Sequence, residues 1–457
     1  MTIQTAIAEL ETVLGDGITR SKSDLDIHGR SETYFAQASP DAVAYPKSSQ
    51  EVAQIVKTCA LHGCPVVPWG TGTSLEGHAL AIRGGITVDM SKMNRILAVN
   101  AEDMDCVVQP GVTRRQLNEE LRATGLFFPV DPGADASLGG MAATRASGTT
   151  AVRYGTMRDN VLGLEVVLAD GRMIRTGSRA RKTSSGYDLT GLFVGSEGTL
   201  GLITELTLKL RGQPEAMSSA VCAFDDIHSA VNAVIMTIQI GIPMARIEFV
   251  DADIAAAFNA ANDADFPPKP HLMIEFHGSD SSVAEDAKRF GEVAEEFGAS
   301  GFKWSTLTEE RNKLWRMRHE AYWSVISQHP GHSSVATDIC VPISRLADAV
   351  EAARADIESS SIKGPILGHV GDGNFHSILL VENDNPAQLE VAKGLAARMV
   401  ERALEVGGTI TGEHGVGMGK LGYMDREHGA GWDVMGEIKR TLDPEGILNP
   451  GKLVRGN

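Results

Sequence analysis

The chain has 457 residues, 42 of them basic and 59 acidic, which gives a formal net charge of −17. This length exceeds what one hydrophobic core usually serves, so we expect two or more domains. The acidic balance argues against a nucleic-acid-binding surface and a polybasic membrane anchor, and an anionic substrate would need a local basic pocket.

The N-terminus and the cysteines bear on the compartment. The first residues lack a charged segment followed by a long apolar core, and no apolar run approaches the length of a membrane span. The five cysteines are an odd number without a CxxC pair, which is typical of reduced cytosolic thiols. We therefore expect a cytoplasmic protein that is at most peripheral to a membrane.

The first predicted elements are a helix and a strand that lead into a loop of small residues. An apolar period over residues 52–59 predicts an amphipathic helix capped by Ser48 or Ser49. A strand over 65–68 follows and leads into the loop 69–77. Backbone N–H groups in such a loop can approach phosphate oxygens closely.

This loop departs from the familiar nucleotide-binding motifs. A Rossmann fingerprint starting at Gly70 needs glycine where the chain has Leu75. A Walker A motif ending at Gly77 needs lysine where the chain has His78. An ordinary glycine-rich turn would be the alternative if the loop stood alone.

Two further stretches of small residues follow it. They are residues 133–148 and residues 195–201, and the second leads into an alternating strand over 203–208. Three such loops between strands predict that backbone packs closely around one large flat or phosphorylated ligand.

The second half of the chain alternates helical and strand patterns. Helices are predicted over 228–240, 283–297 and 386–406, with strands over 245–250 and 272–276. This order is typical of a sheet with covering helices, an α+β domain. Another predicted helix carries Arg311, Arg316 and Arg318. Charged residues spaced in this way usually form a solvent-exposed face of a helix.

Residues 361–380 predict a hairpin with polar residues at its turn. His369 and His376 flank a Gly-Asp-Gly-Asn turn, whose glycines allow the chain to double back so that the two imidazoles converge. Glu413 can complete a set of two histidines and one carboxylate for a divalent ion. His414 lies between Glu413 and Gly415, and it is then available as a base.

Several segments resemble a known superfamily. Residues 68–74, 132–148, 154–155, 161–167 and 195–198 resemble the FAD domain of the vanillyl-alcohol oxidase/p-cresol methylhydroxylase superfamily. Residues 369–376, 412–415 and 442–452 are similar to its FAD-dependent D-2-hydroxyacid dehydrogenases, the branch of the cytochrome-linked D-lactate dehydrogenases, the glycolate oxidase D subunit and the D-2-hydroxyglutarate dehydrogenases. The resemblance extends from about residue 35 to residue 455.

The resemblance implies an α+β fold. It comprises a two-subdomain FAD-binding domain of the p-cresol methylhydroxylase type, an antiparallel-sheet substrate or cap domain, and a C-terminal segment that returns to the flavin. The expected ranges are 1–37 for an N-terminal helical segment, 38–214 for the FAD domain, 215–420 for the substrate and metal domain, and 421–457 for the C-terminal segment. Some members attach the flavin to a histidine, but His78 falls after the loop, so we expect non-covalent FAD.

The resemblance also implies site residues. A divalent ion (Zn²⁺, Mn²⁺ or Fe²⁺) on His369, His376 and Glu413 would bind the substrate, and His414 would be the general base. Arg318 would hold the substrate carboxylate, and Asn374 would reach the substrate or orient a ligand. FAD would contact Pro68, Gly70, Thr71, Gly72, Thr73, Ser74, Gly77, Pro132, Gly133, Ala134, Ser137, Gly139, Gly140, Ala143, Ser147, Gly148, Tyr154, Gly155, Glu197, Gly198, Gly201, Ile203 and Asn449.

Ala336 bears on the substrate. In the hydroxyglutarate-oxidising relatives a lysine stands there, two positions before the residue that matches Asp338, and pairs with the distal carboxylate. Alanine favours a short or apolar side chain, so we expect oxidation of D-lactate to pyruvate by hydride transfer to flavin N5. The alternatives are a glycolate oxidase D-type subunit, a D-2-hydroxyglutarate dehydrogenase, an electron-transfer scaffold and a metallohydrolase. The acceptor (cytochrome c, a quinone or an electron-transfer flavoprotein) and the oligomeric state, a homodimer included, stay open.

Overall fold

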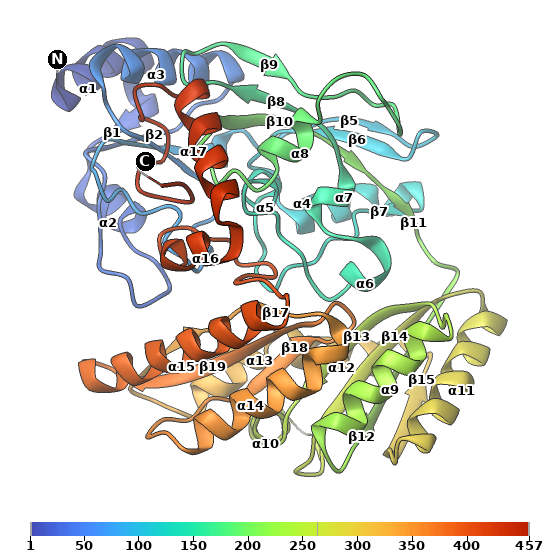
Figure 1. The fold of residues 1–457 in the computed structure, drawn as a ribbon. Helices are drawn as coiled ribbons and strands as arrows, with labels where there is room; N and C mark the ends of the chain where they lie inside the picture. Colours follow the sequence, from blue (N-terminus) through green and yellow to red (C-terminus); the bar gives the residue numbers. More distant parts are fainter. Residues whose placement is uncertain (1, 263, 456–457) are drawn as a thin grey trace. The chain divides into compact units, whose positions relative to one another are not determined.

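The computed structural model describes residues 2–262 and 264–455, which fall into two compact units. Unit 1 contains Met1–Ser147, Gly155–Gln213 and Glu413–Asn457, and unit 2 contains Gly148–Tyr154 and Pro214–Gly412 (Figure 1). No described helix is both long and apolar enough to cross a membrane.

The first subdomain of unit 1 is built on a four-stranded sheet. Its order is β1 (Ile18–Thr19), β2 (Ala42–Ala44), β4 (Ile86–Asp89) and β3 (Val66–Trp69), with β2, β4 and β3 parallel. Helices α1 (Ile3–Leu14) and α3 (Ser49–His62) bury their apolar faces in its core. The predicted helix is confirmed as α3: the Ser48 hydroxyl accepts from the N–H of Glu51, and Gly63 ends the helix in the left-handed conformation.

The second subdomain of unit 1 is an antiparallel sheet of five strands. Its order is β5 (Ile96–Asn100), β6 (Asp105–Val108), β10 (Leu202–Lys209), β8 (Val161–Val167) and β9 (Met173–Arg175). Its core includes residues of α4 (Arg114–Glu120) and α5 (Leu138–Thr144), and α17 (Ala430–Leu442) packs at its edge. The two-subdomain architecture expected of the FAD domain is therefore present in unit 1.

Unit 2 is built on an antiparallel sheet of eight strands. Its order is β15 (Ser300–Ser305), β12 (Ala216–Ala223), β14 (His271–Gly278), β13 (Met244–Val250), β18 (Ile366–His369), β19 (Asn374–Glu382) and β16 (His332–Ala336), and β17 (Ile339–Cys340) also pairs with β19. The predicted hairpin is formed by β18 and β19, with its turn at residues 370–373. The antiparallel sheet expected of the substrate domain is confirmed.

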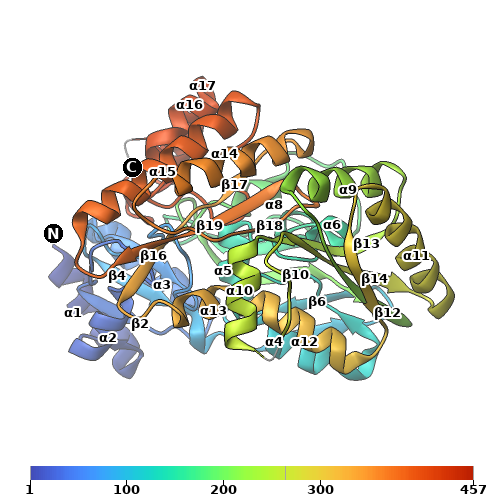
Figure 2. The ribbon, with the colours of Figure 1, turned by 90° about the horizontal axis from the view of Figure 1, so that it is seen from below.

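Helices cover both faces of this sheet. Helices α9 (Ile227–Gln239), α11 (Asp280–Glu296), α14 (Leu346–Glu358) and α15 (Pro386–Glu405) pack on one face. Helices α10 (Ala252–Ala261), α12 (Thr308–His319) and α13 (Ala321–Ser327) share an apolar cluster with the other face. Figure 2 shows the two groups on opposite sides of the strands. The candidate site of unit 2 lies on the face beneath α12.

Candidate active site

The three loops of small residues that the sequence singled out lie against one another in unit 1. A Cβ atom added at Gly70 would collide with the Ser137 hydroxyl, which belongs to the second loop. A Cβ atom added at Gly198, in the third loop, would collide with the ring of Pro68. Glycine is therefore required at both positions, and this close approach is the backbone packing expected around a large cofactor.

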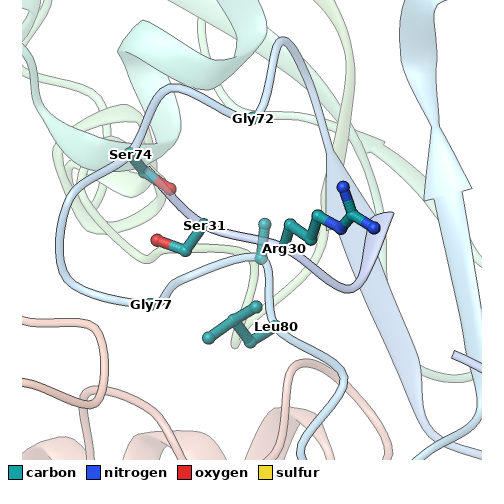
Figure 3. A pocket seen from close by; sticks show the side chains of 7 residues that line it. Arg30, Ser31, Gly72, Ser74, Gly77 and Leu80 are labelled. Atoms are coloured by element: carbon teal, nitrogen blue, oxygen red, sulfur yellow. The ribbon is translucent and has the colours of Figure 1, made fainter. Parts of the chain in front are cut away.

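The first loop also closes on a segment that the sequence analysis missed. Arg30 and Ser31, which follow helix α2 (Lys22–His28), line a small hollow with Gly72, Ser74 and Gly77. Figure 3 shows the loop curving around this hollow, with Ser31 and Ser74 facing across it. No motif marked the pair, because an arginine and a serine after a short helix are common on any protein surface.

The C-terminal segment returns to these loops. Asn449 adopts a φ of 40° and donates from Nδ2 to the carbonyl oxygens of His78 at 3.0 Å and Glu197 at 2.7 Å. Lys452 is fully buried and donates to the carbonyl of Leu80 at 2.7 Å. Burial is the main reason that the pKa of Lys452 falls to about 8. The return predicted for residues 421–457 is therefore present within unit 1.

Two of the predicted FAD-binding residues, Gly148 and Tyr154, belong to unit 2, whereas the others belong to unit 1. The Tyr154 hydroxyl forms a 2.7 Å hydrogen bond with Nδ1 of His277 on β14. Val152 precedes Tyr154 by two residues and packs on Gly371, where an added Cβ atom would lie 2.8 Å from the Val152 side chain. The short segment is therefore held against the sheet of unit 2.

Polar side chains gather on one face of this sheet because alternate residues of a strand point the same way. Arg246 lies directly across from Glu275, and His369 lies across from Asn374. The row that faces α12 consists of Ser219, Arg246, Glu248, Glu275, His277, His369, Asn374 and His376. We call this row the polar strip.

The two predicted metal-binding histidines lie side by side on the strip, with ring centroids 5.4 Å apart. Nδ1 of His369 donates to the Glu248 carboxylate at 2.8 Å, and Nδ1 of His376 donates to the carbonyl of Thr337 at 3.0 Å. These bonds place the ring protons on Nδ1, so that Nε2 carries the lone pair in each ring. Histidines that bind metal usually have this arrangement.

Asn374 is buried and serves as an anchor. Its Nδ2 donates to the Asp338 carboxylate and to the carbonyl of Ile339, both at 2.8 Å. Asp338 also accepts from the Thr411 hydroxyl at 2.5 Å, and a Cβ atom on Gly412 would collide with the Asn374 amide. The residues that lead to Glu413 are thereby fixed to the strip.

Arg318 lies inside unit 2. It is 7% exposed, and its Nη2 donates to the fully buried Glu248 carboxylate at 2.5 Å. Its Nε is buried and has no hydrogen-bond partner among the described residues, so the guanidinium retains a donor for a bound anion. The alternative of a solvated charged face holds only for Arg316, since Arg311 also turns toward the strip and lies 3.7 Å from Glu275.

Glu248 is the main residue that the sequence analysis missed. Its carboxylate joins His369 to Arg318 and has no exposed surface. A signal was present, because Arg246 and Glu248 alternate with Ile247 and Phe249 in an otherwise apolar strand. Charged residues on one face of a buried strand require partners on the same face.

Glu413 and His414 begin the last segment of unit 1. The loop 413–418 is held there by Glu197, whose carboxylate accepts from the N–H groups of Val416 at 2.7 Å and Gly417 at 2.8 Å. Burial alone would raise the pKa of the Glu197 carboxyl, but His78 and the two amides outweigh it, so its pKa is lowered.

Comparison with protein families identifies the class. Residues 40–177 match the family described as FAD binding domain, and residues 213–453 match FAD linked oxidases, C-terminal domain. The fold is similar to that of p-cresol methylhydroxylase with substrate bound, with a TM-score of 0.80 at 19% identity, covering 98% of this chain and 96% of that one. The chain is therefore a flavoprotein of the vanillyl-alcohol oxidase/p-cresol methylhydroxylase fold.

Within that class, the chain belongs to the family of FAD-linked oxidases. It is 46% identical to "Probable D-lactate dehydrogenase, mitochondrial" of Danio rerio over 99% of this chain and 92% of the relative. It is 44% identical to "D-lactate dehydrogenase [cytochrome], mitochondrial" of Arabidopsis thaliana over 98% and 80%. It is 35% identical to a glycolate oxidase subunit of Bacillus subtilis over 91% and 89%. The resemblance stated from the sequence is confirmed.

Proposed function

We propose that this flavoprotein is a divalent-metal-dependent dehydrogenase of D-2-hydroxy acids, with D-lactate as substrate and pyruvate as product. The observation that carries the proposal is the pair of imidazoles on the polar strip, each with its proton on Nδ1 and its lone pair on Nε2. The names of the relatives at 46% and 44% identity support D-lactate as the acid.

The donor set of the strip fits a divalent ion. His369 and His376 would supply two nitrogen ligands, and Glu413 would supply a carboxylate. Gly412 packs on the Asn374 amide of the polar strip. Glu413 is the next residue, and the Cα atoms of neighbouring residues are about 3.8 Å apart, so the backbone of Glu413 starts close to the strip. When bound there, the ion would lower the pKa of the substrate hydroxyl and orient the acid. Zn²⁺, Mn²⁺ and Fe²⁺ all suit this set.

The other roles belong to side chains of the chain itself. Arg318 binds the substrate carboxylate, since its buried Nε has no partner among the described residues. Glu248 keeps that guanidinium and His369 in fixed orientations. His414 takes the hydroxyl proton as general base. Non-covalent FAD, held by the three loops of unit 1, would accept the hydrogen from Cα as hydride.

The surroundings of Ala336 support a short substrate. Ala336 lies across from Ile378, which follows His376 by two residues and shares its face of the sheet. Ile378 belongs to an apolar cluster with Leu367 and Leu380. Alanine stands at position 336 in place of the lysine of the hydroxyglutarate-oxidising relatives, so a distal carboxylate would lose solvation there without the cation that this lysine supplies.

The test compares kcat/KM for D-lactate, D-2-hydroxyglutarate and glycolate with an artificial electron acceptor. We expect the highest value for D-lactate in the isolated chain. A higher kcat/KM for D-2-hydroxyglutarate would contradict the substrate assignment. Turnover of glycolate only in the presence of partner subunits would favour the glycolate oxidase alternative. The 35% identity to the glycolate oxidase subunit of Bacillus subtilis is the reason to test it. The Arabidopsis thaliana relative is named as a cytochrome-type D-lactate dehydrogenase, which supports a cytochrome as the physiological electron acceptor.

A further inference from the structure

Glu197 has an unusual combination of backbone and side chain. Its φ is 53°, in the left-handed region that costs a side-chain-bearing residue more than glycine. Its carboxylate is buried as well, with the residue 4% exposed. A strained backbone and a buried charge at one position indicate that the side chain performs a task that glycine cannot.

The task is visible in its contacts. One carboxylate oxygen accepts from the N–H of Val416 at 2.7 Å, and the other accepts from the N–H of Gly417 at 2.8 Å. The first oxygen also lies 3.2 Å from Nε2 of His78, whose ring is buried. The two amides belong to the loop 413–418, directly after the proposed base.

The backbone of the loop 413–418 packs directly against Glu197 and His78. Gly415, next to His414, has a φ of 82°. A Cβ atom there would lie 2.7 Å from Nε2 of His78 and 2.8 Å from the Glu197 carboxylate. Any larger residue would therefore push the loop away or displace the pair. The second glycine of the Gly-Glu-His-Gly motif is required for this contact.

A second attachment holds the far side of the loop. The N–H of Met418 donates to the carbonyl of Glu76 at 2.9 Å, and Lys420 pairs with the Glu76 carboxylate at 3.3 Å. Glu76 lies near the end of the first small-residue loop, and His78 directly follows that loop. The loop 413–418 is thus fixed by residues from two of the three loops that form the FAD-binding surface.

We propose that Glu197, braced by His78, is the positioning residue that sets the placement of Glu413 and His414 relative to the FAD-binding loops. The inference rests on the proposed function, in which those two residues act on the substrate. The pair acts through the main chain of the loop, because its contacts are with the amides of Val416 and Gly417 and with Gly415. Misplacement of a reacting group by about 1 Å can lower a rate by roughly 10²-fold.

The experiment is Glu197→Gln in the FAD-loaded full chain. Glutamine keeps the volume but offers a single acceptor oxygen in place of two, so one amide of the loop loses its partner. We expect kcat with D-lactate to fall by roughly 10- to 100-fold, while KM, the flavin spectrum and the melting temperature stay close to those of the control. Glu197→Asp, which keeps both oxygens on a shorter stem, should lose less.

The matched control is Glu165→Gln. Glu165 is a half-buried carboxylate on β8 that accepts from Ser49 at 2.6 Å and pairs with Arg175 at 3.1 Å. It belongs to the same unit and has no role in the proposed site, so its loss should leave kcat unchanged. A purely structural role for Glu197 predicts parallel losses of FAD and melting temperature instead of a selective loss of kcat.

Two results would overturn the proposal. Normal kcat in folded, FAD-loaded Glu197→Gln would refute it, and an inactive His414→Ala measured beside it would show that the proposed function still stands. Normal kcat in both variants would refute the role of His414 as well. Gly415→Ala is the second test: the added methyl should lower kcat in the FAD-loaded protein, and wild-type turnover would refute a role for the contact of the loop with Glu197 and His78.

Discussion

Glu248→Gln is the most informative change in unit 2. Its carboxylate is fully buried, accepts from Nδ1 of His369 at 2.8 Å and pairs with Arg318 at 2.5 Å. Glutamine preserves the volume and one acceptor oxygen, but it cannot balance the guanidinium charge. The substitution therefore leaves a buried arginine without its counter-ion and weakens the orientation of a proposed metal ligand.

Two magnitudes follow from this geometry. Removal of one partner of a buried ion pair costs about 3–5 kcal/mol, and we expect ~3 kcal/mol because glutamine still accepts one hydrogen bond. For a unit of about 200 residues, this lowers the melting temperature by roughly 6–12 °C. Loss of the carboxylate behind a metal-binding histidine lowers metal affinity by roughly 10- to 100-fold.

The assay combines thermal unfolding of the FAD-loaded protein with a titration of the metal-free protein by Zn²⁺ and by Mn²⁺. Glu275→Gln is the control, because Glu275 is also buried on the polar strip and pairs with Arg246 at 3.4 Å and His277 at 2.8 Å. Both variants should melt lower, and only Glu248→Gln should bind metal more weakly. Wild-type metal affinity in folded Glu248→Gln would refute the link between Glu248 and a metal site.

Three further substitutions test the proposed roles. His369→Ala should lose metal and most turnover but keep FAD, since the FAD-binding loops lie elsewhere in the chain; unchanged metal content would disprove the ligand assignment. His414→Ala should keep metal and FAD while kcat falls by roughly 10²-fold or more, and a normal kcat would remove it from the mechanism. Ala336→Lys places a cation on the strand beside His376 and should raise kcat/KM for D-2-hydroxyglutarate relative to D-lactate; an unchanged ratio would count against the specificity argument.

Local patterns predicted the elements well. The helix over 228–240 is α9 (Ile227–Gln239), and the hairpin with its histidines is β18 and β19. These succeed because period and turn chemistry are written in neighbouring residues. The convergence of the three small-residue loops was also predictable, since close backbone approach requires glycine in each loop.

Long-range partners were harder to predict. Glu248 binds a histidine 121 positions later in the chain, and Glu197 binds amides 219 and 220 positions later. No local period encodes such pairs. The unit boundaries show the same effect: residues 148–154, expected in the FAD domain, belong to unit 2, and residues 413–420, expected in the substrate domain, belong to unit 1.

The most direct test of the account is an anaerobic visible spectrum of the purified protein, recorded before and after D-lactate and, on a fresh sample, L-lactate. We expect D-lactate alone to bleach the flavin band, because Arg318 and the proposed metal ligands would orient only one stereoisomer for hydride transfer from Cα. A yellow protein that neither D-lactate nor any other 2-hydroxy acid bleaches would contradict the proposed reaction.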